Sequence, residues 1–425
     1  MKKRALAILM AALTASTMLA VPTFAADYSG EDPQLEKNIK ILTIWAEDND
    51  NGVLLNKICE DYQKNVNPNF TWEYEMVASD NLQQKIATLA ASNDLPDLFA
   101  YEAGAPLSVL IDSGKVKNIT EAVDEIGTAD YLNSGAVELL KGLSGTDDLY
   151  DLPLGLNVEG FWYNKALFEQ AGCEVPTTWD ELKAACEALK AYDDSIYPWG
   201  IDMTTDEGQA AFAYYTWNNG GGFVDDDGNW TLNSEQNVEA IQYAIDLVNS
   251  GYTNTDPAND TRYDLQDMFG AGKVAMLIAP NSLPTYIATG GNEVNYGVAS
   301  IPSNTGESVS AGVMDRFMCF DNDYSDDEKA AISTFFDYFY DDARYTEWVD
   351  MEGFLPATKT GGEALAAANE DMASWIDILD SCKFYPTAKA EWADVKQGVI
   401  NVEQNALLGG DVQELLDDLQ AEIAG

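Results

Sequence analysis

The sequence contains no histidine, and its 23 lysine and arginine residues are far outnumbered by 72 aspartate and glutamate residues. Without histidine, the Ser-His-Asp and Cys-His catalytic arrangements and histidine-ligated zinc sites are excluded. The net charge of −49 disfavours nucleic acids and anionic lipids as partners, because they carry charge of the same sign. Ten tryptophans and twenty-one tyrosines supply the aromatic surface that disordered acidic chains lack, so we expect a folded protein with an acidic surface.

Cysteine is also scarce: the chain has five, and the first is Cys59. Their wide spacing is not that of a dense disulfide framework, and an odd number leaves at least one thiol unpaired within the chain. We expect these residues to behave as small buried hydrophobic side chains. Cys173 and Cys186 are the pair to test first for a disulfide.

Long apolar runs are confined to the N-terminus. Three basic residues at 2–4 precede an apolar run over 5–20, and small residues occupy the −3 and −1 positions of a cleavage site after Ala25. We predict that residues 1–25 form a signal peptide and that the rest is exported to a periplasm or a cell surface. No lipobox cysteine stands at the cleavage point, so a lipid anchor is not expected. The alternative is an uncleaved anchor helix, but this run is short for the ~20 apolar residues of a membrane span.

The length of 425 residues favours two or three domains. Residues 39–45 are apolar and β-branched and predict a strand, whereas the apolar spacing over 51–66 predicts a helix. Two further strands, at 72–77 and 95–101, enclose another helical pattern. Strands that alternate with helices indicate parallel β-α-β units and an α/β fold.

Helix starts are clearly marked in the middle and the C-terminal part of the chain. Thr178 with Glu181 and Ser325 with Glu328 form capping boxes, in which the hydroxyl and the carboxylate satisfy free N–H groups at the helix start. Ser234 is predicted to cap a third helix. Strand-like runs return at 274–279 and 296–302, and no long linker separates units, so we expect the domains to interleave.

The stretch GFWYNKALFEQAG, residues 160–172, reads as a strand followed by a helix that Asn164 caps and Gly172 ends. Two other motifs fail. FGAGKV lacks the first glycine and the Ser or Thr of a phosphate loop, and DDDGN at 225–229 lacks the flanking acids of a calcium loop and predicts a hairpin turn. The sequence therefore predicts no cofactor and no metal site.

Seven stretches, in this order, resemble the maltose-binding-protein-like solute-binding proteins of ABC importers, the carbohydrate-binding group. They are LTIWAE (42–47), ATLAASNDLPDLFAY (87–101), YDLPLGLNVEGFWYNKALFEQAG (150–172), VPTTWDEL (175–182), MFGAGKVAML (268–277), YGVASIP (296–302) and GFLPATKT (353–360). The resemblance covers nearly all of the chain after the predicted signal peptide.

The resemblance implies a two-lobed α/β fold of the periplasmic-binding-protein type, with interleaved lobes, a hinge and a ligand cleft between them. Lobe one is expected over 38–155 plus 312–365, and lobe two over 156–311 plus 366–425. It also implies a monomer without a catalytic step, which binds a carbohydrate and delivers it to an ABC transporter membrane permease.

Sugars present apolar ring faces and many hydroxyl groups, so they bind to aromatic side chains and planar polar groups. In α/β sheets such groups gather where strands end. Trp45, Glu47 and Asp48 end the first predicted strand, and Tyr101 and Glu102 end the third. The alternative for the first set is a buried Trp45 beside solvated acids. For Tyr101, the resemblance implies a stacking role.

The resemblance also implies ligand contacts from Asn157, near the crossing between lobes, and from Tyr214 and Trp217. Trp392 falls where the group places a stacking tryptophan. A core role for either Tyr214 or Trp217 is an equal alternative, and for Trp392 it also stays open.

Asp315 and Arg316 interrupt a run of apolar and small residues near the second crossing. We expect either that Asp315 orients Arg316, or that both bind ligand hydroxyls in the bidentate way that suits planar charged groups. An interlobe salt bridge is the alternative.

Three functions follow from these observations. Capture of a neutral mono- or oligosaccharide is favoured, because arginine is scarce and the acidic field disfavours anionic solutes. The same fold could instead bind a cationic solute such as a polyamine, which the negative charge attracts. A secreted carbohydrate-active enzyme that uses two carboxylates is the third, but with 72 acids a close pair carries little information.

Overall fold

The computed structural model describes residues 36–77, 79–92, 94–101, 111, 114–116, 118–120, 132, 134–205, 207–225, 227–319, 325–361, 375, 378 and 381–424. The predicted signal peptide and Glu102 lie outside these residues. Within them, no helix has both the length and the apolar character required to cross a bilayer.

In the described residues, nine strands form one sheet of order β2-β1-β3-β8-β4-β6-β5, with β7 paired to β4 and β9 paired to β8. Their bounds are β1 (Lys37–Thr43), β2 (Phe70–Met76), β3 (Leu98–Tyr101), β4 (Asp151–Asn164), β5 (Tyr197–Gly200), β6 (Val274–Pro280), β7 (Tyr296–Ala299), β8 (Ser310–Cys319) and β9 (Cys382–Lys383). β1 pairs in parallel with both β2 and β3, which confirms the predicted parallel β-α-β units.

The helices are α1 (Asp50–Asn65), α2 (Ser79–Ser92), α6 (Ser134–Ser144), α7 (Lys165–Ala171), α8 (Trp179–Tyr192), α9 (Gly208–Trp217), α10 (Glu235–Asn249), α11 (Arg262–Gly270), α12 (Leu283–Thr289), α13 (Asp326–Phe339), α14 (Asp342–Glu352), α17 (Trp392–Leu407) and α18 (Val412–Ala424). Both predicted capping boxes are present, at the starts of α8 and α13. Asn164 accepts hydrogen bonds from two N–H groups of α7, and Gly172 ends that helix at φ 71°. These signals act over three or four residues, which is why the sequence predicts them well.

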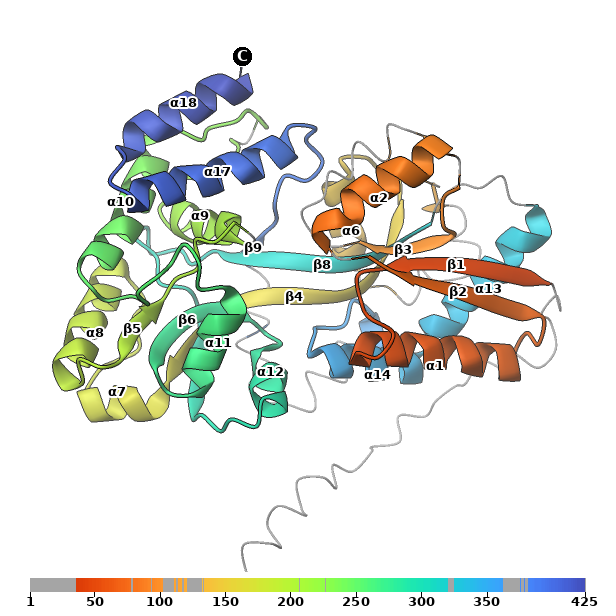
Figure 1. Cartoon of the computed structure of the whole chain (residues 1–425), viewed down its shortest axis with the longest axis horizontal. Coiled ribbons are helices and arrows are strands. Elements are labelled where there is room, and N and C mark those ends of the chain that lie inside the picture. The colour runs from red at the N-terminus through yellow and green to blue at the C-terminus, as the bar shows by residue number, and fades with distance from the viewer. Residues whose placement is uncertain are drawn as a thin grey trace, which may run out of the picture.

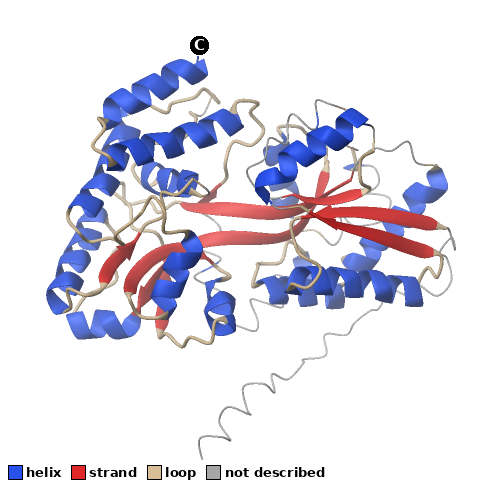
Figure 2. Cartoon of the chain, in the orientation of Figure 1, coloured by secondary structure: helices blue, strands red, loops and turns tan. Residues whose placement is uncertain are grey.

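Two groups of helices surround opposite ends of β4 and β8, which run together from one group to the other (Figures 1 and 2). We call the group around β1–β3 lobe one and the group around β5–β7 lobe two. We propose that the lobes divide at the predicted boundaries, since residues 155 and 312 lie inside these connecting strands. A register shift between Pro153 and Gly155 supports a bend there, because bulges kink a strand.

The described cysteine side chains, at positions 59, 173, 186 and 382, are all free. Cys186 is fully buried, as a small hydrophobic core residue would be, whereas Cys173 is partly exposed. The pair chosen for a disulfide test, Cys173 with Cys186, is therefore not joined in this structure.

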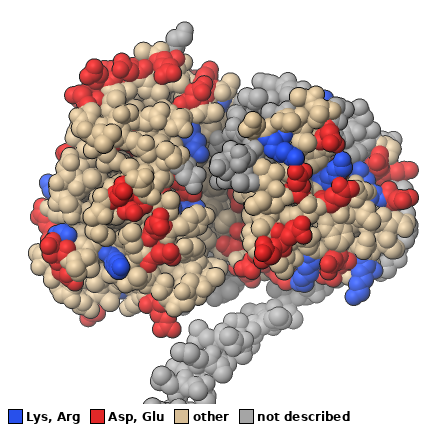
Figure 3. All heavy atoms as spheres, viewed as in Figure 1, with Lys and Arg blue, Asp and Glu red and all other residues tan. Residues whose placement is uncertain are grey.

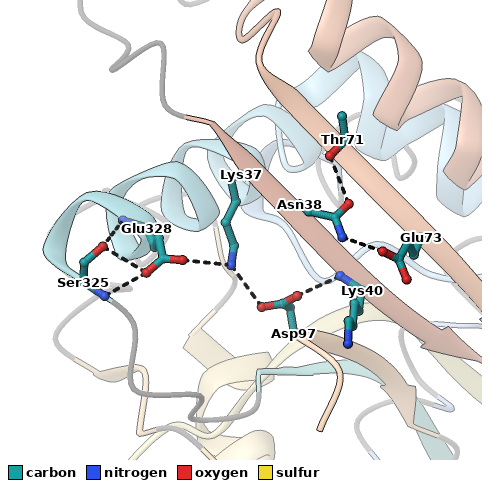
Figure 4. Close-up of polar contacts among 8 residues, drawn as sticks. All are labelled: Lys37, Asn38, Lys40, Thr71, Glu73, Asp97, Ser325 and Glu328. Atoms are coloured by element: carbon teal, nitrogen blue, oxygen red, sulfur yellow. Dashed lines mark hydrogen bonds and ion pairs between the residues drawn. The ribbon is translucent and has the colours of Figure 1, made fainter. Parts of the chain in front are cut away.

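Lys37 joins three elements at the outer end of lobe one. Its Nζ lies 3.3 Å from Asp97 Oδ1 and 3.5 Å from Glu328 Oε1 (Figure 4). Asp97 Oδ2 accepts a hydrogen bond from the Lys40 N–H at 2.7 Å, and Glu328 also completes the capping box with Ser325. The network thus ties β1 to the segment before β3 and to the start of α13.

Replacing Lys37 with methionine is expected to lower the free energy of unfolding by about 2–3 kcal/mol, because the buried carboxylate of Asp97 then loses its cation. The loss stays below that of a fully enclosed pair, since the Glu328 side chain is 42% exposed. Lys40→Met is the control, because its ion pair with Asp94 lies at the surface and is expected to contribute less than ~1 kcal/mol. Urea unfolding measures both, and equal losses would contradict the prediction.

Candidate functional site

The strands direct their carboxyl ends toward the crossing between the lobes. β8 runs from lobe two into lobe one, and Tyr101 pairs with Arg316 while Leu98 pairs with Cys319, so β3 ends near the crossing. β1 is parallel to β3 and ends on the same side. In lobe two, Pro280 pairs with Glu159, so β6 also ends near the crossing, and β5 is parallel to β6. The carboxyl ends of strands from both lobes therefore lie near the crossing, where polar groups are expected to gather. Figure 3 shows the surface hollowed between the two lobes.

One amide connects the two lobes at this place. Asn281, directly after β6, accepts a hydrogen bond from the Val158 N–H at 2.7 Å, and its Nδ2 donates to the Gly353 carbonyl at 2.5 Å. A Cβ on Gly353 would lie within 2.9 Å of Thr285 Oγ1, so the backbone after α14 packs closely on α12 of lobe two. This contact fixes how closely the lobes approach on this side.

On the lobe-one side, Trp45 follows β1 and is partly buried. Its ring packs edge-on against Trp348 with centroids 5.4 Å apart, and its carbonyl accepts a hydrogen bond from the Tyr74 hydroxyl at 2.9 Å. Glu47 and Asp48 are exposed. The tryptophan thus lies between core and surface, while the two acids are exposed to solvent.

The end of β3 gives less information. Tyr101 is its last residue and pairs with Arg316 through the backbone. The structure describes the backbone of Tyr101, and Glu102 lies outside the described residues. Their predicted ligand contacts stay predictions.

Asn157 lies in β4 close to the crossing, opposite Val313. Its side-chain oxygen is buried and has no hydrogen-bond partner in the structure. A buried acceptor without a partner is costly in a folded protein, so such an atom calls for a water molecule or a ligand group. The position fits the predicted role of Asn157 in binding.

A small pocket of about 40 Å³, partly open to solvent, lies where β5 and β6 end in lobe two. Its polar and aromatic lining comes from Trp199, Asp202, Glu207, Tyr214, Tyr215 and Arg262. Tyr214 therefore lines a cavity of lobe two, and its ligand contact stays a prediction.

Trp217 and Trp392 are core residues instead. Trp217 is 5% exposed, and its ring lies 5.9 Å from that of Phe223 and 6.0 Å from that of Tyr385. Trp392 is 0% exposed and stacks on Tyr385 at 5.3 Å. In this arrangement neither ring offers a face to a solute, so the structure supports the core alternative for both.

The predicted role of Arg316 is corrected by its burial. Arg316 is 0% exposed, and its NH1 donates to Asp151 Oδ2 at 2.9 Å within an equally buried ion pair. Asp151, which the sequence analysis did not select, thus orients the arginine. The guanidinium is not accessible to ligand hydroxyls in this structure.

Asp315 belongs instead to a group of acids at the crossing. Burial, together with the charges of Asp315 and Asp50, raises the pKa of Glu352 to about 8. Glu352 Oε1 is buried without a partner. Because Glu352 lies directly before Gly353, this group borders the contact between the lobes.

The polar wall of the lobe-two pocket was missed by the sequence analysis. Arg262 donates from Nε and NH2 to both carboxylate oxygens of Glu207, at 2.6 and 2.9 Å. Burial raises the pKa of Asp202 to about 6. A capping box of Thr261 with Asp264 places Arg262 at the start of α11. The sequence carries this signal, provided that the capping-box pattern accepts Asp as well as Glu at its fourth position.

The carboxyl ends of the strands in the two lobes face each other across β4 and β8, and a polar pocket lies beside them. This arrangement is compatible with a two-lobed binding protein. A family model, the bacterial extracellular solute-binding protein, matches residues 46–343. The chain belongs to this family. At the level of the family it is a solute-binding protein and not an enzyme, and it is exported. Cleavage after Ala25 stays a prediction.

Similar proteins agree with this assignment. A binding protein of Brucella abortus (strain 2308) is 28% identical over 360 residues, which cover 84% of this chain and 85% of that one. The multiple sugar-binding protein of Streptococcus mutans is 30% identical over 144 residues, which cover 34% and 32%.

Solved structures show the same fold. An ABC transporter solute-binding protein of Thermotoga lettingae, bound with α-D-tagatose, has a TM-score of 0.77 at 18% identity and covers 91% of this chain and 98% of that one. A sugar transporter protein of Arthrobacter chlorophenolicus with bound laminaribiose has a TM-score of 0.76 at 21% identity and covers 91% and 99%. The two-lobed α/β fold expected from the sequence is thereby confirmed.

Proposed function

We propose that this solute-binding protein captures a neutral mono- or oligosaccharide in the cleft between its lobes and delivers it, as a monomer, to an ABC transporter permease. The observation that carries the proposal is the buried amide oxygen of Asn157, which has no hydrogen-bond partner and lies near the crossing. The aromatic rings of Trp45, after β1, and of Tyr214, at the lobe-two pocket, support it. Hydroxyl groups and apolar ring faces need such surroundings. The sugars bound by related proteins and structural neighbours support the same class of solute.

A thermal-shift screen tests the proposal with maltose, laminaribiose, mannobiose, mannotriose and D-tagatose, followed by calorimetric titration of the sugars that raise Tm. A ligand that binds only the folded state raises Tm with concentration. Spermidine serves as the cationic competitor. Stabilisation by spermidine and by none of the sugars would overturn the proposal and favour the cationic alternative. Incubation with polysaccharides, followed by an assay of new reducing ends, tests the enzymatic alternative.

Asn157→Ala is expected to weaken sugar binding about tenfold or more, because it removes a buried hydrogen-bonding group from the cleft. Lys165→Ala is the control in the same segment: Lys165 is exposed on α7, beyond β4, and its replacement is expected to leave the dissociation constant unchanged. Calorimetric titration of both folded variants provides the measurement. A large loss for Lys165→Ala would contradict the proposed position of the site.

A further inference from the structure

Glu159 carries a buried oxygen without a partner, two residues beyond Asn157. The residue is 8% exposed, and its Oε2 has no hydrogen-bond partner in the structure. Alternate residues of a strand point to the same face, so Asn157, Glu159 and Phe161 share one face of β4 beyond the register shift at Pro153. The two unpartnered oxygens therefore lie along one line that leads from the crossing into lobe two.

Three residues that line the lobe-two pocket lie near Glu159. They are Tyr214, Arg262 and Glu207, and each of them shifts the pKa of the Glu159 carboxyl. The titratable or charged groups that interact with its carboxyl are Tyr214, Arg262, Glu207, Tyr385 and Cys382.

These groups do not supply a free cation to Glu159. Arg262 is engaged by both oxygens of Glu207. Burial accordingly raises the pKa of Glu159 to about 8, although the charge of Arg262 and the hydrogen bond from Tyr214 oppose the shift. Near neutral pH the group is a carboxylic acid, which has one hydrogen to donate and an oxygen to accept with.

We propose that the carboxyl group of Glu159 donates a hydrogen bond to a hydroxyl group of the bound sugar, next to the contact made by Asn157. This inference rests on the proposed function and assigns one determinant of specificity in lobe two. Residues two apart in a strand are separated by about 7 Å, a span on the order of one sugar ring, so Asn157 and Glu159 can bind two hydroxyl groups of the same ring. An anionic solute is disfavoured at this position, because its charge would be buried beside an arginine that Glu207 already engages.

Three variants test the assignment. The probe is the sugar that raises the Tm of the wild type in the screen of maltose, laminaribiose, mannobiose, mannotriose and D-tagatose. Glu159→Ala is expected to weaken binding about tenfold or more. Glu159→Gln is expected to stay within about threefold, because an amide keeps both a donor and an acceptor. Glu403→Gln is the matched control: Glu403 is a fully buried carboxyl of α17 whose two oxygens also lack partners, and its replacement is expected to leave affinity unchanged.

The pH profile gives a readout that a purely structural role does not produce. Wild-type affinity is expected to fall as pH rises through about 8, where the carboxyl loses its hydrogen, whereas Glu159→Gln is expected to stay level from pH 6 to 9. Parallel profiles would overturn the inference even if Glu159→Ala failed to fold. Equal affinities of wild type and Glu159→Ala would overturn it as well and leave the proposed function standing. If no sugar of the screen binds the wild type, the proposed function fails and the inference fails with it.

Discussion

Replacing Arg316 with methionine is expected to lower the free energy of unfolding by about 3–5 kcal/mol, one of the two largest effects that the structure predicts. The guanidinium and its partner Asp151 are both 0% exposed and lie 2.9 Å apart. Removal of the cation leaves a carboxylate that cannot reach water, and burial already raises the pKa of Asp151 although Arg316 opposes the shift. Because the pair joins β4 to β8, the loss falls on the strands that connect the lobes.

A double-mutant cycle separates this ion pair from a simple loss of packing. Asp151→Leu alone leaves the buried arginine without its partner and is also expected to lower the free energy of unfolding. The double variant Asp151→Leu with Arg316→Met leaves neither charge unpaired, so it is expected to be more stable than the sum of the two single losses predicts, by about 2 kcal/mol or more. Urea unfolding at pH 7 measures all four proteins. Additive losses would contradict a direct coupling between the two side chains.

The same pair shows why the sequence could predict some elements and not others. Capping boxes and amphipathic spacing act within a few residues, so the starts of α8 and α13 and the extent of α1 follow from the sequence alone. β8 was not predicted, because its partner β4 lies more than 150 residues earlier in the chain. Arg316 in an apolar stretch was noticed as unusual, but nothing local identifies Asp151, 165 residues away, as its partner.

The residues of the candidate site were harder to predict from the sequence for a different reason. Aromatic residue type does not distinguish a core ring from a ring that lines a cleft: Tyr214 and Trp217 lie in the same helix, yet only Tyr214 lines the pocket. Nearly every residue of α9 is buried, so hydrophobic periodicity offers no exposed face by which to choose. Glu159 was overlooked although it lies inside the stretch that identified the family, because its burial depends on α9 and α11 and is invisible in β4 itself.

The double variant Glu159→Gln with Glu352→Gln is expected to remove a large part of the pH dependence of stability between pH 5 and 8, the part that these two carboxyls contribute. In the folded protein, burial raises both pKa values to about 8 from the ordinary value of 4.5. In this window the unfolded chain has lost these two protons while the folded chain keeps them, so unfolding releases protons and rising pH favours it. Each group lowers the free energy of unfolding by about 1.4 kcal/mol per pH unit, on the order of 3–4 kcal/mol from pH 5 to 8.

The absence of histidine makes this window unusually informative. Exposed carboxylates titrate near pH 4 and histidine is the residue that ordinarily titrates between pH 5 and 8, so the net charge of the folded surface changes little there. A fall in stability across the window must then come from buried acids, to which Glu403 adds in the same direction and Asp202 adds near pH 6. Urea unfolding at four pH values measures the slope of stability against pH. Glu414→Gln, at an exposed position of α18, is the control and is expected to keep the wild-type slope. Parallel stability curves for wild type and double variant would show that these carboxyls are ionised in the folded protein.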